Sequence, residues 1–294
     1  MFATVKNLLR DNICNSILLI SDLSIYYNPS AGSGRAEKVR KAVQALLDAR
    51  GVKYALLERD KLDKAHKDVI VIGGDGTFNT LLNGLSKPEE HRFVLLAGGT
   101  SNSLYSQISG KENAINKVQR YLDDAPFLRT DLPELTCNGQ TWRFINEASA
   151  GFAASIAQMI ERRSTKKRFN QLGLNELAYI ATAFRCWRRE EPVMVSFCNN
   201  KRISGDLYPC PGAKLDDGLI DVFELRCPRL RLPLELTRLI RAKNDVASKW
   251  TKRKQISTGK WLFDTPLPVE IDGNPIGKTS EIELHLYSAS IEVL

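Results

Sequence analysis

Short apolar runs alternate with longer amphipathic stretches through the first 125 residues. The runs predict strands at 23–27, 52–57, 68–72 and 93–96. The amphipathic stretches have the three- to four-residue apolar spacing of half-buried helices, and they predict helices at 35–50, 77–85 and 112–124. Nearly continuous apolar strands are typical of a parallel sheet that is covered on both faces. We therefore expect an α/β unit with a mainly parallel sheet.

The pattern changes after Pro126, where predicted strands follow one another. An Asn138-Gly139 pair predicts a type I′ hairpin between strands at 127–137 and 140–145. Further strands are expected at 193–198, 260–263, 267–271 and 281–294, and helices at 172–189 and 233–254.

These elements predict two domains after an N-terminal extension, as the length of 294 residues and the 43% hydrophobic content allow. The extension comprises residues 1–22, and an α/β N-terminal domain with a mainly parallel sheet comprises 23–125. A mainly β, sandwich-like C-terminal domain with a few helices comprises 126–294. We leave open that the last strand returns to the first domain.

The stretch Gly73-Gly74-Asp75-Gly76-Thr77 joins the predicted strand 68–72 to the predicted helix 77–85. Glycines at such a turn expose backbone N–H groups beside the positive end of the helix dipole, an arrangement that binds phosphate. The Asp75 carboxylate would repel phosphate unless a cation lay between them, so it indicates Mg²⁺ bridging to a triphosphate. An ordinary glycine-containing structural turn is the alternative.

Two further turns have similar chemistry. Residues 28–34 follow the first predicted strand, and residues 97–104 follow the strand at 93–96. Their small residues and hydroxyl groups suit contacts with phosphate or ribose, although a plain polar βα turn would also explain them.

Residues 73–77, together with Asn79, resemble the signature of the superfamily of diacylglycerol kinases, sphingosine kinases and NAD kinases. Further matching stretches follow the order expected for this superfamily at 28–32, 99–102, 146–152 and 211–222, with Asp272-Gly273 near the end. The set covers nearly the whole chain. It is most similar to soluble bacterial lipid kinases that are related to diacylglycerol kinase.

The resemblance implies an ATP-dependent lipid kinase that transfers the γ-phosphate of ATP to the hydroxyl of diacylglycerol or a related lipid, with Mg²⁺. The nucleotide-binding residues that it implies are Asn28, Pro29, Ser30, Ala31, Gly32, Gly73, Gly74, Asp75, Gly76, Thr77, Phe78, Asn79, Thr100 and Asn102. The implied catalytic residues are Asp75, which would organise the metal, and Asp272, near the acceptor hydroxyl.

The resemblance also implies a structural Mg²⁺ in the stretch 211–222. Its ligands would be the Asp217 carboxylate and the carbonyl oxygens of Lys214 and Leu219. Oxygen ligands of this kind suit a hard cation. A simple Asp-Gly turn is the alternative interpretation.

The chain departs from the family pattern at three places. Ser103 replaces an expected aspartate, Asn274 replaces the glutamate that takes the proton from the acceptor, and the connection 58–67 is short. An amide cannot act as a general base, but a positioned base contributes only about 10²- to 10⁴-fold. We therefore expect reduced activity, with Asp272 or Asp75 taking the proton.

Two alternatives to lipid phosphorylation stay open. The three departures also fit a pseudokinase that binds nucleotide or lipid without turnover. Glu147 matches the ribose-holding Asn-Glu pair of NAD kinases, which keeps NAD phosphorylation as a minor alternative.

The formal net charge of +8 favours an anionic partner. Basic residues cluster at 162–168, 185–189 and 238–254, beside the aromatic residues Phe169, Trp187 and Trp250. These clusters are either solvated helix faces or a surface for anionic headgroups, where each basic residue contributes about 1 kcal/mol. The expected partners are ATP and a lipid substrate at an anionic membrane surface, with a homodimer left open and no nucleic acid.

Cysteine spacing and hydropathy indicate in which cellular compartment the protein is located. The six cysteines form no C-x-x-C pair, so we expect buried, reduced thiols rather than a zinc site or disulfides. No apolar run approaches the roughly 18 residues of a membrane span, and the N-terminus lacks the features of a signal peptide. A cytoplasmic location is expected, with peripheral contact at the inner membrane face.

Overall fold

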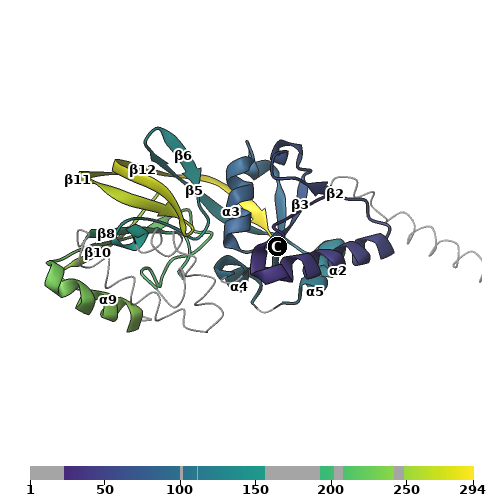
Figure 1. Ribbon diagram of the computed structural model, residues 1–294, viewed down its shortest axis with the longest axis horizontal. Helices are drawn as coiled ribbons and strands as arrows, with labels where there is room; N and C mark the ends of the chain where they lie inside the picture. Colours follow the sequence, from purple (N-terminus) through teal and green to yellow (C-terminus); the bar gives the residue numbers. More distant parts are fainter. Residues whose placement is uncertain (1–22, 100–101, 111, 156–192, 202–207, 242–247) are drawn as a thin grey trace, which may run out of the picture.

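The computed structural model describes residues 23–99, 102–110, 112–155, 193–201, 208–241 and 248–294 (Figure 1). Four parallel strands form the N-terminal part of the sheet: β1 (Leu23–Tyr27), β2 (Ala55–Leu57), β3 (Asp68–Gly73) and β4 (Arg92–Ala97). Their spatial order is β2-β1-β3-β4. The predicted α/β unit is therefore confirmed, although only the last three residues of the predicted strand 52–57 are extended.

Helices cover both faces of these strands. The helices are α2 (Arg35–Ala49), α3 (Asp75–Gly84), α4 (Ser103–Ser109) and α5 (Ala114–Leu122). Residues of α2 and α5 share one hydrophobic cluster with Ile25, Ile70 and Val94 of the sheet, whereas α3 and α4 pack with Val69 and Phe93 on the other face. Both faces are buried, which explains why the strands are almost entirely apolar.

The C-terminal half is mainly antiparallel. Its strands are β5 (Leu128–Cys137), β6 (Gln140–Arg143), β7 (Glu147–Gly151), β8 (Val193–Cys198), β9 (Ile220–Arg226), β10 (Thr251–Ile256), β11 (Thr258–Ile271) and β12 (Asn274–Val293). In this half, residues 152–155 are helical, and helix α9 (Leu232–Arg241) follows a short 3₁₀ turn at Arg229–Arg231. None of the described helices has the length and apolar content needed to cross a membrane.

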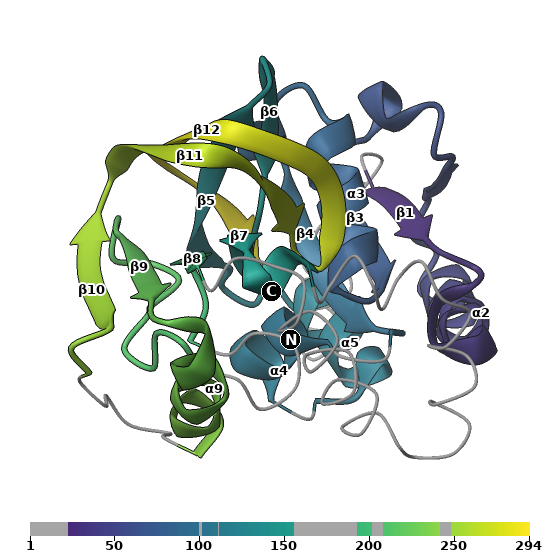
Figure 2. The ribbon, with the colours of Figure 1, turned by 60° about the vertical axis from the view of Figure 1, so that its left-hand side comes forward.

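Strand β12 joins the two halves into one twelve-stranded sheet. It pairs with β11 and β5 along its length, and its end runs parallel to β4, where Val293 pairs with Phe93 (Figure 2). Ile291 and Val293 are fully buried in the cluster that contains Phe93. The last strand therefore does return to the N-terminal part of the sheet.

Several local expectations are confirmed. Asn138 and Gly139 have φ angles of 51° and 73°, as both central residues of a type I′ turn require. Helix α2 and strand β8 lie where the pattern placed them. Cys137, Cys198, Cys210 and Cys227 are buried and free.

Other expectations were wrong in their boundaries. Residues 147–151 form a central strand whose small residues fit between β8 and β11, and the chain becomes helical at Phe152. The predicted helix 233–254 is described as helical up to Arg241, but residues from Thr251 onward form the strand β10, which contains the consecutive basic residues Lys252, Arg253 and Lys254. Strand β11 is continuous where two strands were expected. The extension 1–22 and the helix predicted at 172–189 lie outside the described residues.

Candidate functional site: three glycine loops held against the C-terminal half

Three loops meet at the carboxyl ends of neighbouring parallel strands. They follow β1, β3 and β4 and comprise residues 28–34, 73–77 and 97–102. Open α/β sheets place their ligands at this edge. The predicted nucleotide-binding residues in these loops therefore come together, except Thr100, which lies outside the described residues.

Glycines allow the three loops to touch. The N–H group of Gly98 donates to the carbonyl of Gly73 at 2.6 Å, and a Cβ atom at Gly99 would lie 2.5 Å from the Cα atom of Gly74. Gly32 has a φ angle of 58°, and a Cβ atom there would lie 2.1 Å from the carbonyl oxygen of Gly98. The centre of the three loops is consequently lined by backbone rather than by side chains.

Asp75 places a carboxylate among these glycines. It is the first residue of α3, it is half-buried, and its Oδ1 atom accepts a hydrogen bond from the N–H group of Leu104 at 3.2 Å. Burial, with the nearby charge of Asp75, raises the pKa of Tyr105 well above its usual value. Backbone N–H groups beside one carboxylate are the donor set that a metal-bridged triphosphate requires, so the loops fit Mg²⁺ and ATP.

Among the side chains that follow Asp75, those of Phe78 and Asn79 point away from the loops, whereas that of Thr77 lies against Gly73. Phe78 is fully buried and packs edge-to-face on Phe93, with 5.1 Å between the ring centroids. Thr77 packs against Gly73, and Asn79 points to the C-terminal half of the chain. Of these three predicted nucleotide-binding residues, Phe78 could contribute only its backbone.

The Asp272 carboxylate connects α3 to the C-terminal half. Its Oδ2 atom accepts from the Nδ2 atom of Asn79 at 2.8 Å and from the N–H group of Ile145 at 3.0 Å. Its Oδ1 atom accepts from the N–H groups of Asn146 and Glu147 at 2.9 and 3.1 Å. A carboxylate has about four acceptor positions, so Asp272 is saturated, which favours a positioning role over proton transfer.

Backbone geometry explains why the turn reads Asp272-Gly273. The two residues have φ angles of 47° and 83° and connect β11 to β12, where Ile271 pairs with Asn274. A two-residue type I′ turn requires positive φ at both positions, which aspartate and glycine tolerate. The turn thus aims the Asp272 side chain back at residues 145–147.

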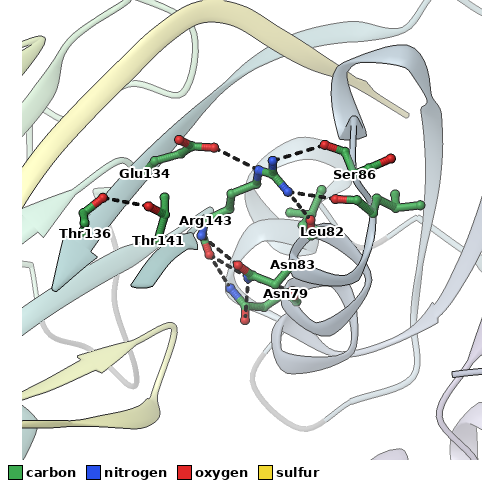
Figure 3. A network of polar contacts seen from close by, with 9 residues as sticks. Asn79, Leu82, Asn83, Ser86, Glu134, Thr136, Thr141 and Arg143 are labelled. Carbon is green, nitrogen blue, oxygen red and sulfur yellow. Dashed lines mark hydrogen bonds and ion pairs between the residues drawn. The ribbon is translucent and has the colours of Figure 1, made fainter. Parts of the chain in front are cut away.

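A second set of contacts holds the carboxyl end of α3 (Figure 3). The Arg143 guanidinium donates to the carbonyl oxygens of Leu82 and Leu85 at 3.1 and 2.8 Å, and it pairs with Glu134 at 3.0 Å. Asn83 exchanges hydrogen bonds with the backbone of Arg143, accepting at 2.8 Å and donating at 2.9 Å. An arginine at this end satisfies helix carbonyls that lack an intrahelical partner.

This role of Arg143 and Asn83 was not predicted from the sequence. A signal existed for Asn83, because residues four apart lie on one helix face and Asn83 follows Asn79 by four positions. Arg143 gave no such signal, since its partners are distant in the sequence.

A buried acidic pair lies beside the Asp272 turn and was also missed. Glu147 and Glu270 are 6% and 5% exposed. The Glu270 side chain accepts from the Ser149 hydroxyl and from the N–H group of Gly273, both at 2.6 Å. Burial raises the pKa of Glu270 to about 7, and burial with the neighbouring Glu270 raises that of Glu147 well above its usual value.

The predicted structural metal loop contains three acids. The Asp217 Oδ1 atom accepts from the N–H group of Leu219 at 3.1 Å, and the N–H group of Gly218 donates to Asp131 at 2.8 Å. Burial, with the charges of Asp217 and Asp216, raises the pKa of Asp131 against the effect of the Gly218 hydrogen bond. Within the described ranges, no group of three or more His, Cys, Asp or Glu side chains could hold a metal ion. Coordination by Lys214, Asp217 and Leu219 would therefore rest on one carboxylate and two carbonyls.

Comparison with known proteins identifies the N-terminal region. Residues 22–132 match the family model of the diacylglycerol kinase catalytic domain. This region is similar to diacylglycerol kinase catalytic domains. The match spans all three glycine loops and Asp75, so the resemblance expected from the motifs is confirmed.

Relatives named as lipid kinases cover most of the chain. One is "Probable lipid kinase YegS-like" of Stenotrophomonas maltophilia (strain K279a), 23% identical over 239 residues, which are 74% of this chain and 75% of the relative. A protein of the same name from Shewanella frigidimarina (strain NCIMB 400) is 26% identical over 70% of each chain. This similarity extends beyond the diacylglycerol kinase catalytic domain.

Solved structures share the fold of the whole chain. The crystal structure of a diacylglycerol kinase from Bacillus anthracis str. Sterne has a TM-score of 0.64 and 16% identity, covering 92% of this chain and 96% of that one. Yeast NADH kinase in complex with NADH has a TM-score of 0.51 and 10% identity, covering 92% and 82%. The parallel sheet followed by mainly antiparallel strands is thus the fold of these kinases.

Replacing Asp272 with asparagine should destabilise the protein by about 3 kcal/mol. The amide NH₂ group of the new side chain would face two donors that now bond to a carboxylate oxygen, and unsatisfied buried donors are costly. Urea unfolding followed by circular dichroism measures the loss. Asp264→Asn, at an exposed site on the same strand, is the matched control and should change stability by less than about 0.5 kcal/mol. A loss below about 1 kcal/mol for Asp272→Asn would contradict a stabilising role of the four hydrogen bonds that Asp272 accepts.

Replacing Glu270 with glutamine should stabilise the protein at high pH. The pKa of Glu270 is raised to about 7 in the folded protein, so its contribution to stability is present below pH 4.5 and is lost as pH rises through 7. Glutamine can still accept from Gly273 and donate to Ser149. The free energy of unfolding of the variant should therefore exceed that of the wild type by up to about 3 kcal/mol at pH 8. Unfolding at pH 5, 6, 7 and 8 measures this difference, and equal pH slopes for the two proteins would refute it.

Proposed function

We propose that this chain is an ATP-dependent lipid kinase that transfers the γ-phosphate of ATP to a hydroxyl of diacylglycerol or a related lipid. The diacylglycerol kinase catalytic domain and the names of the relatives support phosphotransfer. The observation that carries the proposal is the convergence of three glycine loops around Asp75.

The three loops supply the positioning and charge neutralisation on which phosphoryl transfer depends. The N–H groups of Asn28, Ser30 and Ala31 already donate within the protein, so Gly32 and the loop 73–77 would hold the phosphates with their backbone. Asp75 would hold Mg²⁺, which neutralises phosphate charge when bound. Asn102 has a φ angle of 49°, and its amide bonds to both the N–H and C=O groups of Gly99 at 3.1 and 3.0 Å. This residue fixes the loop after β4 in contact with Gly74.

Asp272 would position the acceptor half rather than take the proton. Its hydrogen bond to Asn79 fixes the turn between β11 and β12 against α3. Asn79 lies four residues after Asp75 in this helix. The acceptor hydroxyl would enter beside this junction. Thr100, also proposed as a nucleotide contact, and the structural Mg²⁺ at Lys214, Asp217 and Leu219 complete the proposed site.

A basic and apolar surface around α9 supports access to lipid at an anionic membrane. Leu230 is 86% exposed between the exposed residues Arg229 and Arg231. Lys249 stacks on the Trp250 ring at 4.9 Å, which places a cation and an aromatic side chain at the start of β10. The basic clusters at 162–168 and 185–189 lie outside the described residues. A homodimer remains a part of this proposal.

A pseudokinase is the second candidate, and Asn274 favours it. This residue is exposed at the β11–β12 turn, and an amide cannot serve as a general base. The pseudokinase would bind ATP without turnover. The third candidate, NAD phosphorylation, differs from both in its acceptor.

Replacing Asp75 with alanine should abolish phosphate transfer. The wild type should transfer ³²P from labelled ATP to mixed membrane lipids in the presence of Mg²⁺, and the variant should lose at least about 10²-fold of this rate because no carboxylate remains to hold the metal at the phosphates. Thin-layer separation of the labelled lipids measures the product.

Asp63→Asn is the control for this assay, because Asp63 is exposed on a distant turn and its loss should leave the rate unchanged. Equal transfer by wild type and Asp75→Ala would refute the assignment of the site. ATP binding with no transfer to any lipid would favour the pseudokinase, and transfer to NAD alone would favour the NAD kinase.

A further inference from the structure

Two glutamates face each other on neighbouring strands beside the proposed acceptor site. Glu270 of β11 pairs directly with Ser149 of β7, and Glu147 lies two residues earlier in β7, on the same face of the sheet. Such diagonal neighbours lie about 7–8 Å apart, within reach of long side chains. The two carboxyl groups therefore form one buried acid pair.

One oxygen atom of this pair has no partner. The Oε1 atom of Glu147 is buried and accepts no hydrogen bond, whereas both oxygen atoms of Glu270 are bonded, to Ser149 and to Gly273. A buried acceptor without a donor is costly. Two donors are available to this atom: the Ser196 hydroxyl of β8, which is also buried without a partner and lies beside Glu147, and an O–H group that a ligand brings.

Hydrogen bonds connect the pair, through Asp272, to the helix that carries Asp75. Gly273, which donates to Glu270, follows Asp272 in the turn, and the N–H group of Glu147 donates to the Asp272 carboxylate. Asp272 bonds in turn to Asn79 of α3. Asp75 and Asn79 are four residues apart and lie on one face of that helix.

We propose that the Glu147–Glu270 pair receives the proton of the acceptor hydroxyl during phosphoryl transfer. The hydroxyl oxygen forms a bond to the γ-phosphorus of ATP, the bond from that phosphorus to the β–γ bridging oxygen breaks, and ADP leaves. The hydroxyl proton passes to the acid pair and then to water. This inference rests on the proposed kinase function, and it assigns to the pair the role that Asn274 cannot fill.

The surroundings of the pair suit proton transfer near neutral pH. Asp272 faces it from the turn, Cys198 from β8 and Cys210 from the segment before β9. Burial raises the pKa of Glu270 to about 7. Because the two acids interact, they titrate as a unit, and a base is most effective when its pKa lies near the working pH.

The test compares pH–rate profiles of the full chain with Mg²⁺, ATP and a mixed-lipid acceptor for wild type, Glu270→Gln and Glu147→Gln. Wild-type kcat/KM should rise through a transition near pH 7. Each variant should lose about 10²-fold in kcat/KM, with the transition absent in Glu270→Gln and the KM for ATP changed less than threefold.

Asp68→Asn is the matched control, because Asp68 is a buried carboxylate that pairs with Arg92 at the start of β3, the end of this strand opposite the glycine loop. Its rate and pH profile should stay within twofold of the wild type. If Glu270→Gln does not fold, Glu270→Asp replaces it; this variant should keep the transition while losing rate.

The outcomes separate the two proposals. Transfer by the wild type with unchanged rates and profiles in both glutamine variants would overturn the acid pair alone. Absence of transfer by the wild type would overturn the kinase function and the acid pair together.

Discussion

The arrangement of the two halves depends on the four hydrogen bonds that the Asp272 carboxylate accepts. One comes from Asn79 on the helix that carries Asp75, and three come from consecutive N–H groups at 145–147. Hydrogen bonds to a charged acceptor are the stronger kind in proteins. A single side chain thus fixes the glycine loops relative to the strands on which an acceptor would lie.

Other contacts near Asp272 also hold the two halves of the chain together. Arg143 holds the carboxyl end of α3 while Asp272 holds its middle, and the end of β12 extends the parallel part of the sheet. Asn199 and Asn200 bond to the backbone and side chain of Asn146, which stabilises the start of β7. Phosphoryl transfer requires alignment above all, and these polar contacts add to the apolar cluster in which Ile145 and Ile291 pack with Phe93.

Sequence patterns predicted the elements whose residues lie close together along the chain. The strand, glycine loop and helix at 68–85 follow from local composition, and the Asn138-Gly139 hairpin follows from turn chemistry. Asp75 and residues of the three loops were likewise expected to contact one nucleotide, because each loop has small residues or hydroxyl groups directly after a predicted strand.

Features that depend on distant partners could not be read from the sequence. Glu270 belongs to a strand pattern that gives no sign of Glu147, 123 positions earlier, and the saturation of Asp272 depends on N–H groups 125 to 127 residues away. The basic stretch at 251–254 was assigned to a helix because its charges do not distinguish an exposed strand from a helix face. Pairing with β9 determines that it is extended.

The central claim is that Asp75 and the surrounding glycine backbone bind a magnesium-bridged triphosphate. Isothermal titration calorimetry of the purified full chain with ATP, with and without Mg²⁺, tests it most directly. The account predicts saturable binding of ATP that weakens at least tenfold when Mg²⁺ is removed. Binding that is absent, or equal in the two conditions, would contradict it.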